Sequence, residues 1–226
     1  MKANLISTLF IGLTCFVFGQ PTGVDAVKAS QDIRKKYIDF STPPSNATSK
    51  SLFVDPFIGT GGHGHTFPGA TAPFGMMQLS PDTRYEGWDG CSGYHYSDSI
   101  IYGFSHTHLS GTGVPDYGDL LIVPQVGFPK LNPGYLDPKG YGSRFSHEQE
   151  NASPGYYEVK LLDQNITVRL TVSERAGMHE YTFGKQKGKR FILIDLDHRD
   201  KLLNYSLNIK DKYTISGSRI SKAWAN

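Results

Sequence analysis

The clearest pattern in the second half of the chain is an alternation of apolar and polar residues. Tyr157, Val159 and Leu161 alternate with polar neighbours, and after the polar turn residues 163–165 the alternation resumes over 166–172. A period of two gives each strand one buried face and one face in water, as in an antiparallel sheet. The pattern predicts a β-hairpin.

Short apolar runs bounded by turn residues predict further strands on both sides of this hairpin. They cover residues 100–104, 120–123, 178–183, 191–196, 203–209 and 213–220. Earlier in the chain, Pro56, Pro68 and Pro73 exclude a long helix. Strands at this spacing without intervening helices favour an all-β fold, an antiparallel β-sandwich over residues 51–226. The last strand runs almost to the final residue, so we expect the sandwich to be incomplete at its C-terminal end.

The first 19 residues have the pattern of a secretory signal peptide. Lys2 is followed by an apolar run over residues 5–18, and cleavage before Gln20 is plausible. The run is shorter than the roughly 20 apolar residues of a transmembrane helix. We therefore expect a secreted or periplasmic protein without a transmembrane segment. Lipid attachment at Cys15 is a weaker alternative, because the residues before it fit a lipid-modified cysteine poorly.

Residues 20–50 have the composition of a linker, with a possible short helix before the turn-forming residues 41–46. The net charge of the chain is only +2, and its lysines and arginines are scattered. This distribution argues against a nucleic-acid partner. Once Cys15 is removed, Cys91 is the only cysteine, so the mature chain cannot form an internal disulfide.

Residues 54–119 are rich in glycine and hold five of the eight histidines. Glycine at this density indicates unusual backbone conformations or backbone that a ligand approaches closely. Trp88 is flanked by Gly87 and Asp89, and an exposed indole there could stack on the apolar face of a sugar. Burial of Trp88 in the core is the competing interpretation. The candidate substrate-binding residues are Trp88, Asp89, His63, His65, Gly61, Gly62 and Tyr94.

Other chemistries fit this stretch less well. Residues 59–64 match the dinucleotide fingerprint G-x-G-x-x-G, but Pro68 and Pro73 block the helix that this fingerprint requires. Cys91 is best interpreted as a small buried side chain. Paired carboxylates for glycoside hydrolysis cannot be recognised from the residues alone without a motif.

Two histidine pairs could bind a metal ion. His63 and His65, and likewise His106 and His108, would each lie on one side of an extended chain. However, residues 66–72 contain no carboxylate that would complete a cupin-like site. Hydrogen bonds to loop backbone or to a ligand hydroxyl are the favoured interpretation of these rings. No segment has the alternating oxygen ligands of an EF-hand.

The glycine-rich stretch resembles the opening of glycoside hydrolase family 92. The resemblance rests on the strings VDPFIGTGGHGH at 54–65, PGATAPFGMMQLSPD at 68–82, GWD at 87–89, CSGYHYSD at 91–98 and GFSHTHLSGTG at 103–113. Weaker similarity continues to the last residue. Members of this family often have a second aromatic residue where this chain has Gly90. This difference leaves open which glycosidic linkage the resemblance implies.

The resemblance implies a calcium-dependent, inverting exo-α-mannosidase with an N-terminal β-sandwich and a C-terminal (α/α)₆ barrel. It also implies that the catalytic carboxylates and most calcium ligands belong to the barrel. We therefore expect no catalytic and no metal-binding residue in this chain, which would supply pocket-wall loops for an α-mannose-containing glycan. Two alternatives remain: a stand-alone carbohydrate-binding module, and a metal-dependent β-fold enzyme that uses the four histidines named above.

Overall fold

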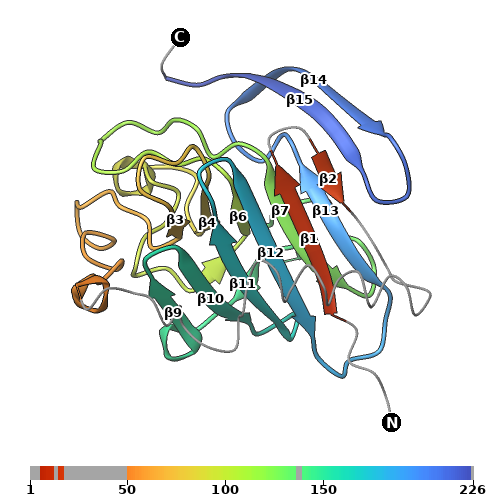
Figure 1. The fold of residues 1–226 in the computed structure, drawn as a ribbon, viewed down its shortest axis with the longest axis horizontal. Helices are drawn as coiled ribbons and strands as arrows, with labels where there is room; N and C mark the ends of the chain where they lie inside the picture. The colour runs from red at the N-terminus through yellow and green to blue at the C-terminus, as the bar shows by residue number, and fades with distance from the viewer. Residues whose placement is uncertain (1–5, 13–14, 18–49, 136–138, 225–226) are drawn as a thin grey trace.

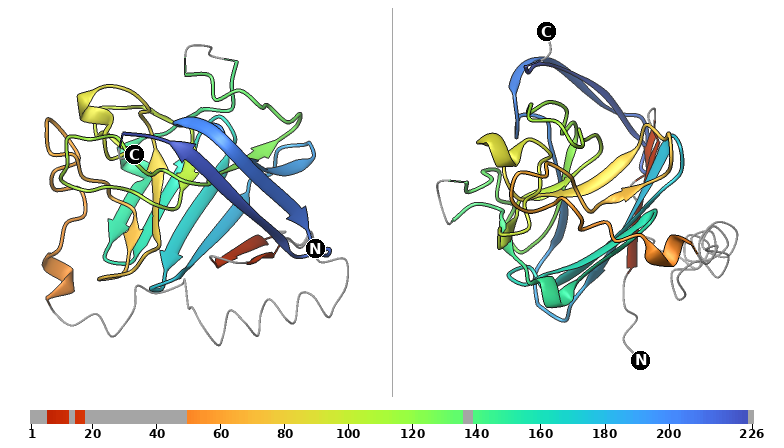
Figure 2. Two further views of the ribbon diagram at one scale, coloured as in Figure 1. Left: turned by 90° about the horizontal axis from the view of Figure 1, so that it is seen from above. Right: turned by 90° about the vertical axis from the view of Figure 1, so that its left-hand side faces the viewer.

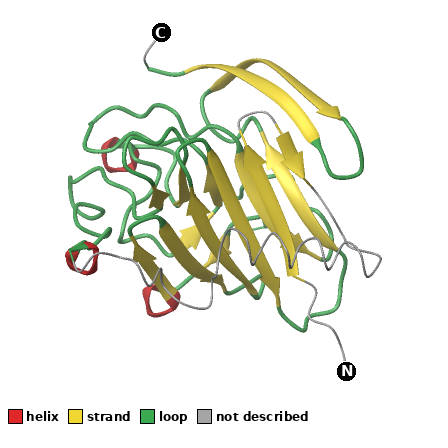
Figure 3. Ribbon diagram, viewed as in Figure 1, coloured by secondary structure: helices red, strands yellow, loops and turns green. Residues whose placement is uncertain are grey.

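The computed structural model describes residues 6–12, 15–17, 50–135 and 139–224. Two antiparallel sheets pack face to face (Figure 1), which confirms the predicted all-β sandwich. The described part of the chain contains only short 3₁₀ turns as helices (Figure 3). They are η1 (Ser51–Phe53), η2 (Trp88–Gly90) and η3 (His147–Gln149). Among these residues, no helix has the length and apolar composition needed to span a membrane.

The larger sheet has eight strands in the order β14-β15-β2-β1-β12-β11-β10-β9. The bounds of its strands, in chain order, are β1 (Ile6–Gly12), β2 (Cys15–Val17), β9 (Glu150–Ser153), β10 (Tyr156–Leu161), β11 (Ile166–Val172), β12 (Ala176–Phe183), β14 (Lys201–Ile209) and β15 (Ile215–Lys222). Except at the junction of β15 with β2 and of β1 with β12, neighbouring strands in this sheet are consecutive along the chain.

The smaller sheet has five strands in the order β13-β7-β6-β4-β3. Its strands are β3 (Ala70–Thr71), β4 (Gln78–Asp82), β6 (Gly103–Ser105), β7 (Leu121–Val126) and β13 (Arg190–Asp195). A separate two-stranded ladder joins β5 (Ile100–Ile101) to β8 (Ser143–Arg144).

The predicted hairpin is β10 and β11, and its register explains the alternation in the sequence. Val159 lies opposite Val168, and both side chains are completely buried between the sheets. From the smaller sheet, Leu79, Phe104 and Ile122 pack into the same core. Burial of one face of each strand against the other sheet is therefore the main stabilising contribution of this region.

The segment predicted as a signal peptide contributes two strands in this structure. The backbone of β1 pairs with β12, from Ile6 opposite Thr182 to Gly12 opposite Ala176. The backbone of β2 pairs with β1 and meets β15 at one position. The predicted linker, apart from Lys50, lies outside the described residues. Cleavage of the first 19 residues stays a prediction.

The hairpin formed by β14 and β15 extends beyond the rest of the sandwich (Figures 1 and 2). It carries large side chains that are mostly exposed, although their apolar character is typical of a core. These include Leu203, Tyr205, Leu207, Ile209 and Ile220. Exposed apolar residues in such a group usually mark an interaction surface.

Candidate functional site

The candidate site is a loop cluster, defined as residues 59–65, 87–96 and 110–113. Backbone hydrogen bonds join the three segments. The amide of Tyr96 donates to the carbonyl of Thr60, and the amide of Gly111 donates to the carbonyl of His65. Segments that are far apart in the sequence therefore meet at one end of the sandwich, among the orange and yellow loops of Figures 1 and 2.

Glycines allow the segment 59–65 to fold back on itself. Gly59 has a φ of +81°, and the amide of Thr66 donates to its carbonyl over 3.2 Å. A Cβ at Gly64 would lie 2.1 Å from the carbonyl oxygen of Gly59, so no other residue fits there. Gly61 and Gly62 are exposed, and little or nothing lies near the positions of their missing Cβ atoms. Their backbone is accessible to a ligand.

Trp88 lies on the surface of the loop cluster at the start of η2. Its side chain is 61% exposed, which favours the surface interpretation over the core interpretation. The ring of His65 contacts the indole edge-to-face, with the ring centroids 5.0 Å apart and the planes at 78°. An indole with an open face and one supported edge is a suitable platform for the apolar face of a sugar.

Asp89 lies beside Trp88 and is oriented by the two histidines of the glycine-rich loop. The His63 Nδ1 donates a hydrogen bond of 2.6 Å to Asp89 Oδ1, and the Nε2 of His65 lies 3.6 Å from the same oxygen. The hydrogen bond from His63 lowers the pKa of the Asp89 carboxyl below its ordinary value. The cluster thus presents a carboxylate and an exposed imidazole next to an aromatic face, a combination that suits a polyhydroxylated ligand.

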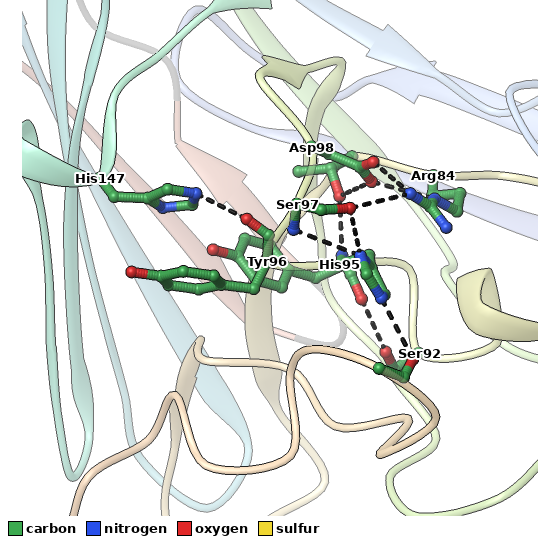
Figure 4. Close-up of polar contacts among 10 residues, drawn as sticks. Arg84, Ser92, His95, Tyr96, Ser97, Asp98 and His147 are labelled. Carbon is green, nitrogen blue, oxygen red and sulfur yellow. Dashed lines mark hydrogen bonds and ion pairs between the residues drawn. The ribbon is translucent and has the colours of Figure 1, made fainter.

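Residues 92–98 contact the glycine-rich loop 59–65 through the side chain of His95 (Figure 4). The Nε2 of His95 donates to the carbonyl of Gly62 over 3.1 Å, and its Nδ1 lies 2.8 Å from the hydroxyl of Ser97. Arg84 forms an ion pair with Asp98 at the other end of this segment (Figure 4). His95 is a positioning residue that the sequence-based prediction did not include.

Tyr94 does not belong to the ligand-facing surface, which corrects its assignment as a binding residue. Its side chain is only 1% exposed. Its hydroxyl lies 3.1 Å from both carboxylate oxygens of Glu150, and the hydroxyl of Tyr157 donates to the same carboxylate over 2.6 Å. The side chain of Glu150 is itself buried, so Tyr94 satisfies an internal charge and points away from a ligand on the surface of the loop cluster.

His147 connects this buried carboxylate to the loop cluster. Its Nδ1 lies 2.6 Å from Glu150 Oε2, and its Nε2 donates to the carbonyl of Tyr96 over 2.6 Å (Figure 4). The imidazole also stacks on the ring of Tyr96, with centroids 4.0 Å apart and an interplanar angle of 8°. No sequence motif predicted this connection, because Tyr94 and Tyr96 are more than 50 residues from their partners Glu150 and His147.

His106 and His108 are buried, and protein groups occupy both ring nitrogens of each. The Nδ1 of His106 donates to the carbonyl of Leu120, and that of His108 donates to the carbonyl of Ser92. These bonds support the hydrogen-bonding interpretation over a metal site. Within the described residues, no group of three or more His, Cys, Asp or Glu side chains could hold a metal ion.

The second nitrogen of His106 faces a histidine of the opposite sheet. Because the Nδ1 of His106 carries the proton, its Nε2 accepts a hydrogen bond of 3.1 Å from the Nε2 of His179. The Nδ1 of His179 then accepts from the hydroxyl of Tyr181 over 2.8 Å. Burial lowers the pKa of His106 to about 4 and that of His179 well below its ordinary value. Both rings are neutral at pH 7.

Cys91 lies beneath the exposed Trp88. Its side chain is 1% exposed, and its thiol donates to the carbonyl of Trp88 over 2.8 Å. Burial raises the pKa of the thiol. This environment agrees with the interpretation of Cys91 as a small buried side chain and disfavours a nucleophilic role.

Comparison with known proteins identifies the class to which this sandwich and its glycine-rich loops belong. The model of the glycosyl hydrolase family 92 N-terminal domain matches residues 53–226. The chain therefore belongs to glycosyl hydrolase family 92, as its sequence motifs indicated.

Solved structures of the family share the fold. A family GH92 α-mannosidase from Bacteroides thetaiotaomicron, solved in complex with mannoimidazole, is 42% identical with a TM-score of 0.74, over 78% of this chain and 24% of that one. The GH92 family glycosyl hydrolase ccman5 is 29% identical with a TM-score of 0.66, over 77% of this chain and 24% of that one.

A curated relative matches as well. An uncharacterized secreted glycosidase from Arthroderma benhamiae is 32% identical over 167 residues, which cover 70% of this chain and 21% of the relative. The present chain thus spans about a quarter of the length of the relatives that it matches.

Proposed function

We propose that this chain is the N-terminal domain of a secreted, calcium-dependent, inverting exo-α-mannosidase that hydrolyses α-mannosides on glycans. In this proposal the loop cluster forms one wall of the sugar pocket. The catalytic carboxylates and most of the calcium ligands belong to a C-terminal (α/α)₆ barrel of the same polypeptide. Membership of family 92 and the similarity to a GH92 α-mannosidase support this assignment.

The observation that carries the proposal is the exposed indole of Trp88 beside the oriented Asp89 carboxylate. Stacking on an aromatic face selects the apolar face of a sugar ring, while a carboxylate accepts hydrogen bonds from adjacent hydroxyls. The accessible backbone of Gly61 and Gly62 leaves room for a ring to approach. All three features lie within the loop cluster and face away from the core.

In this proposal, two carboxyl groups of the C-terminal barrel carry out the chemistry, one as the acid and one as the base. A glutamic acid would protonate the glycosidic oxygen, and an aspartate would activate water on the opposite face of the sugar. In an inverting enzyme the two carboxyl groups are separated by about 6.5–9.5 Å to admit that water. This chain would supply binding and orientation of the sugar, and no proton transfer is assigned to its residues.

The exposed apolar side chains of β14 and β15 support the proposal that another polypeptide segment covers this hairpin. In the proposal, the partner is the remainder of the same polypeptide. Burial of these side chains would favour association by about 25 cal/mol per Å² of apolar surface. Secretion is supported by the predicted signal peptide and by the relative named as a secreted glycosidase.

Hydrolysis of an aryl α-mannoside by the full-length protein tests the proposal. We expect activity that a calcium chelator abolishes and added calcium restores, with β-mannose as the first product detected by NMR. The isolated 226-residue chain should be inactive under the same conditions. Turnover of the α-mannoside by the isolated chain, with contaminants excluded, would overturn the assignment of the catalytic carboxylates to the barrel.

A further inference from the structure

The indole of Trp88 lies directly against the backbone of Gly113, which is 25 residues later in the chain. A Cβ built on Gly113 would lie 2.0 Å from Cη2 of the indole, 2.5 Å from Cζ3 and 2.6 Å from Cζ2. Contacts this short do not occur between real atoms. Any residue other than glycine at position 113 would therefore displace the six-membered ring of Trp88 or move the loop.

Backbone conformation does not explain the glycine at this position. Gly113 is not among the glycines with positive φ, whereas its neighbour Gly111 has a φ of +73° and open space around it. An alanine could adopt the backbone conformation of residue 113. The steric requirement for glycine there arises from the contact with Trp88.

The segment that carries Gly113 is held in place independently of the indole. The amide of Gly111 donates to the carbonyl of His65 over 2.7 Å, and the hydroxyl of Thr112 donates to the carbonyl of Val114 over 3.3 Å. The ring of His65 supports the indole from a second direction. Contact from two sides restricts the tilt of the indole and still leaves 61% of the residue exposed.

We propose that Gly113 is a positioning residue for Trp88, which sets the tilt of the open indole face and thereby the stacking geometry of the bound sugar. The proposal rests on the proposed function, because it takes the ligand of Trp88 to be a mannose ring. A displaced indole would stack poorly on that ring and would weaken binding of the substrate more than it slows turnover.

The test uses Gly113→Ala in the full-length protein, labelled with 5-fluorotryptophan, and the Trp88 signal is assigned with Trp88→Phe. We expect the ¹⁹F resonance of Trp88 to shift and KM for an aryl α-mannoside to rise by about five- to tenfold, with kcat nearly unchanged, a loss of about 1 kcal/mol of binding. Lys187→Ala is the control, because Lys187 is exposed, lies between β12 and β13 and is outside the loop cluster. This variant should change neither quantity.

A double variant shows whether Gly113 acts through Trp88. In the Trp88→Ala background the indole is absent, so Gly113→Ala should fold and cause no further loss of kcat/KM. A further loss of the same size in that background would overturn the positioning role. So would a Gly113→Ala protein with an unchanged Trp88 resonance and unchanged KM.

Failure of the proposed function gives a different result. If the resonance shifts but Trp88→Ala keeps the full kcat/KM, Gly113 still positions the indole, and the sugar-binding role of Trp88 is wrong. The ¹⁹F resonance therefore tests whether Gly113 positions Trp88, and the kinetics test whether Trp88 binds the sugar.

Discussion

Trp88 and Tyr94 are separated by only six positions and have opposite environments. The indole follows Gly87, which has a φ of +83°, and it remains mostly exposed. The phenol points into the core, where Glu150 requires hydrogen-bond donors. The sequence predicted both as binding residues, because the local sequence of a glycine-rich loop does not indicate the direction in which an aromatic side chain points.

Substitution of Tyr94 by phenylalanine tests this distinction. Tyr94→Phe removes one donor from the buried carboxylate of Glu150, so we expect the free energy of unfolding to fall by about 1.5–3 kcal/mol. Because the side chain is remote from the ligand surface, KM of the full-length protein should not change. A raised KM with an unchanged free energy of unfolding would show that Tyr94 contributes to ligand binding instead.

At the scale of elements, the sequence predicted the hairpin of β10 and β11 most closely, because the periodicity of two in both strands reflects one face buried in the sandwich. β12 was predicted as an apolar run instead, and it is buried at five consecutive positions. β4 gave no such signal, since it contains Pro81 and is buried at four consecutive positions. β3, β8 and β9 are short and polar or small, and pairing with distant partners decides their structure.

A buried hydrogen bond between His106 and His179 also joins the two sheets. Both rings have folded-state pKa values below the unfolded value, so the unfolded state binds more protons as the pH falls below about 6.5. Stability is therefore lost between pH 6.5 and about 4, and His106 alone accounts for about 3 kcal/mol of this loss. We expect the melting temperature to fall across this range.

The variant His179→Gln checks the origin of this pH dependence. Glutamine can donate and accept hydrogen bonds but cannot be protonated near neutral pH. The decrease in melting temperature between pH 6.5 and 4.5 should be smaller in this variant than in the wild type. An equal decrease in both proteins would show that His179 does not contribute to the pH dependence.

At the scale of the whole molecule, the sandwich leaves an apolar surface on the hairpin of β14 and β15. The chain also spans only about a quarter of its relatives, and the proposed partner of this surface is the remaining polypeptide. We expect the isolated 226-residue chain to self-associate, which light scattering after size-exclusion chromatography would detect. Replacement of Tyr205 and Ile209 by serine should reduce the association. A monomeric wild-type chain with a cooperative melting transition would contradict this expectation.

The central claim is that the loop cluster is a wall of a mannose-binding pocket. It is tested most directly by kcat/KM for an aryl α-mannoside, measured with the melting temperature for wild-type and Trp88→Ala full-length protein. Loss of sugar stacking should cost about 1–3 kcal/mol, or about five- to more than a hundredfold in kcat/KM. The melting temperature should change little, because removal of an exposed indole leaves no large cavity. A large decrease in melting temperature with unchanged kcat/KM for the folded variant would show that Trp88 serves the core instead.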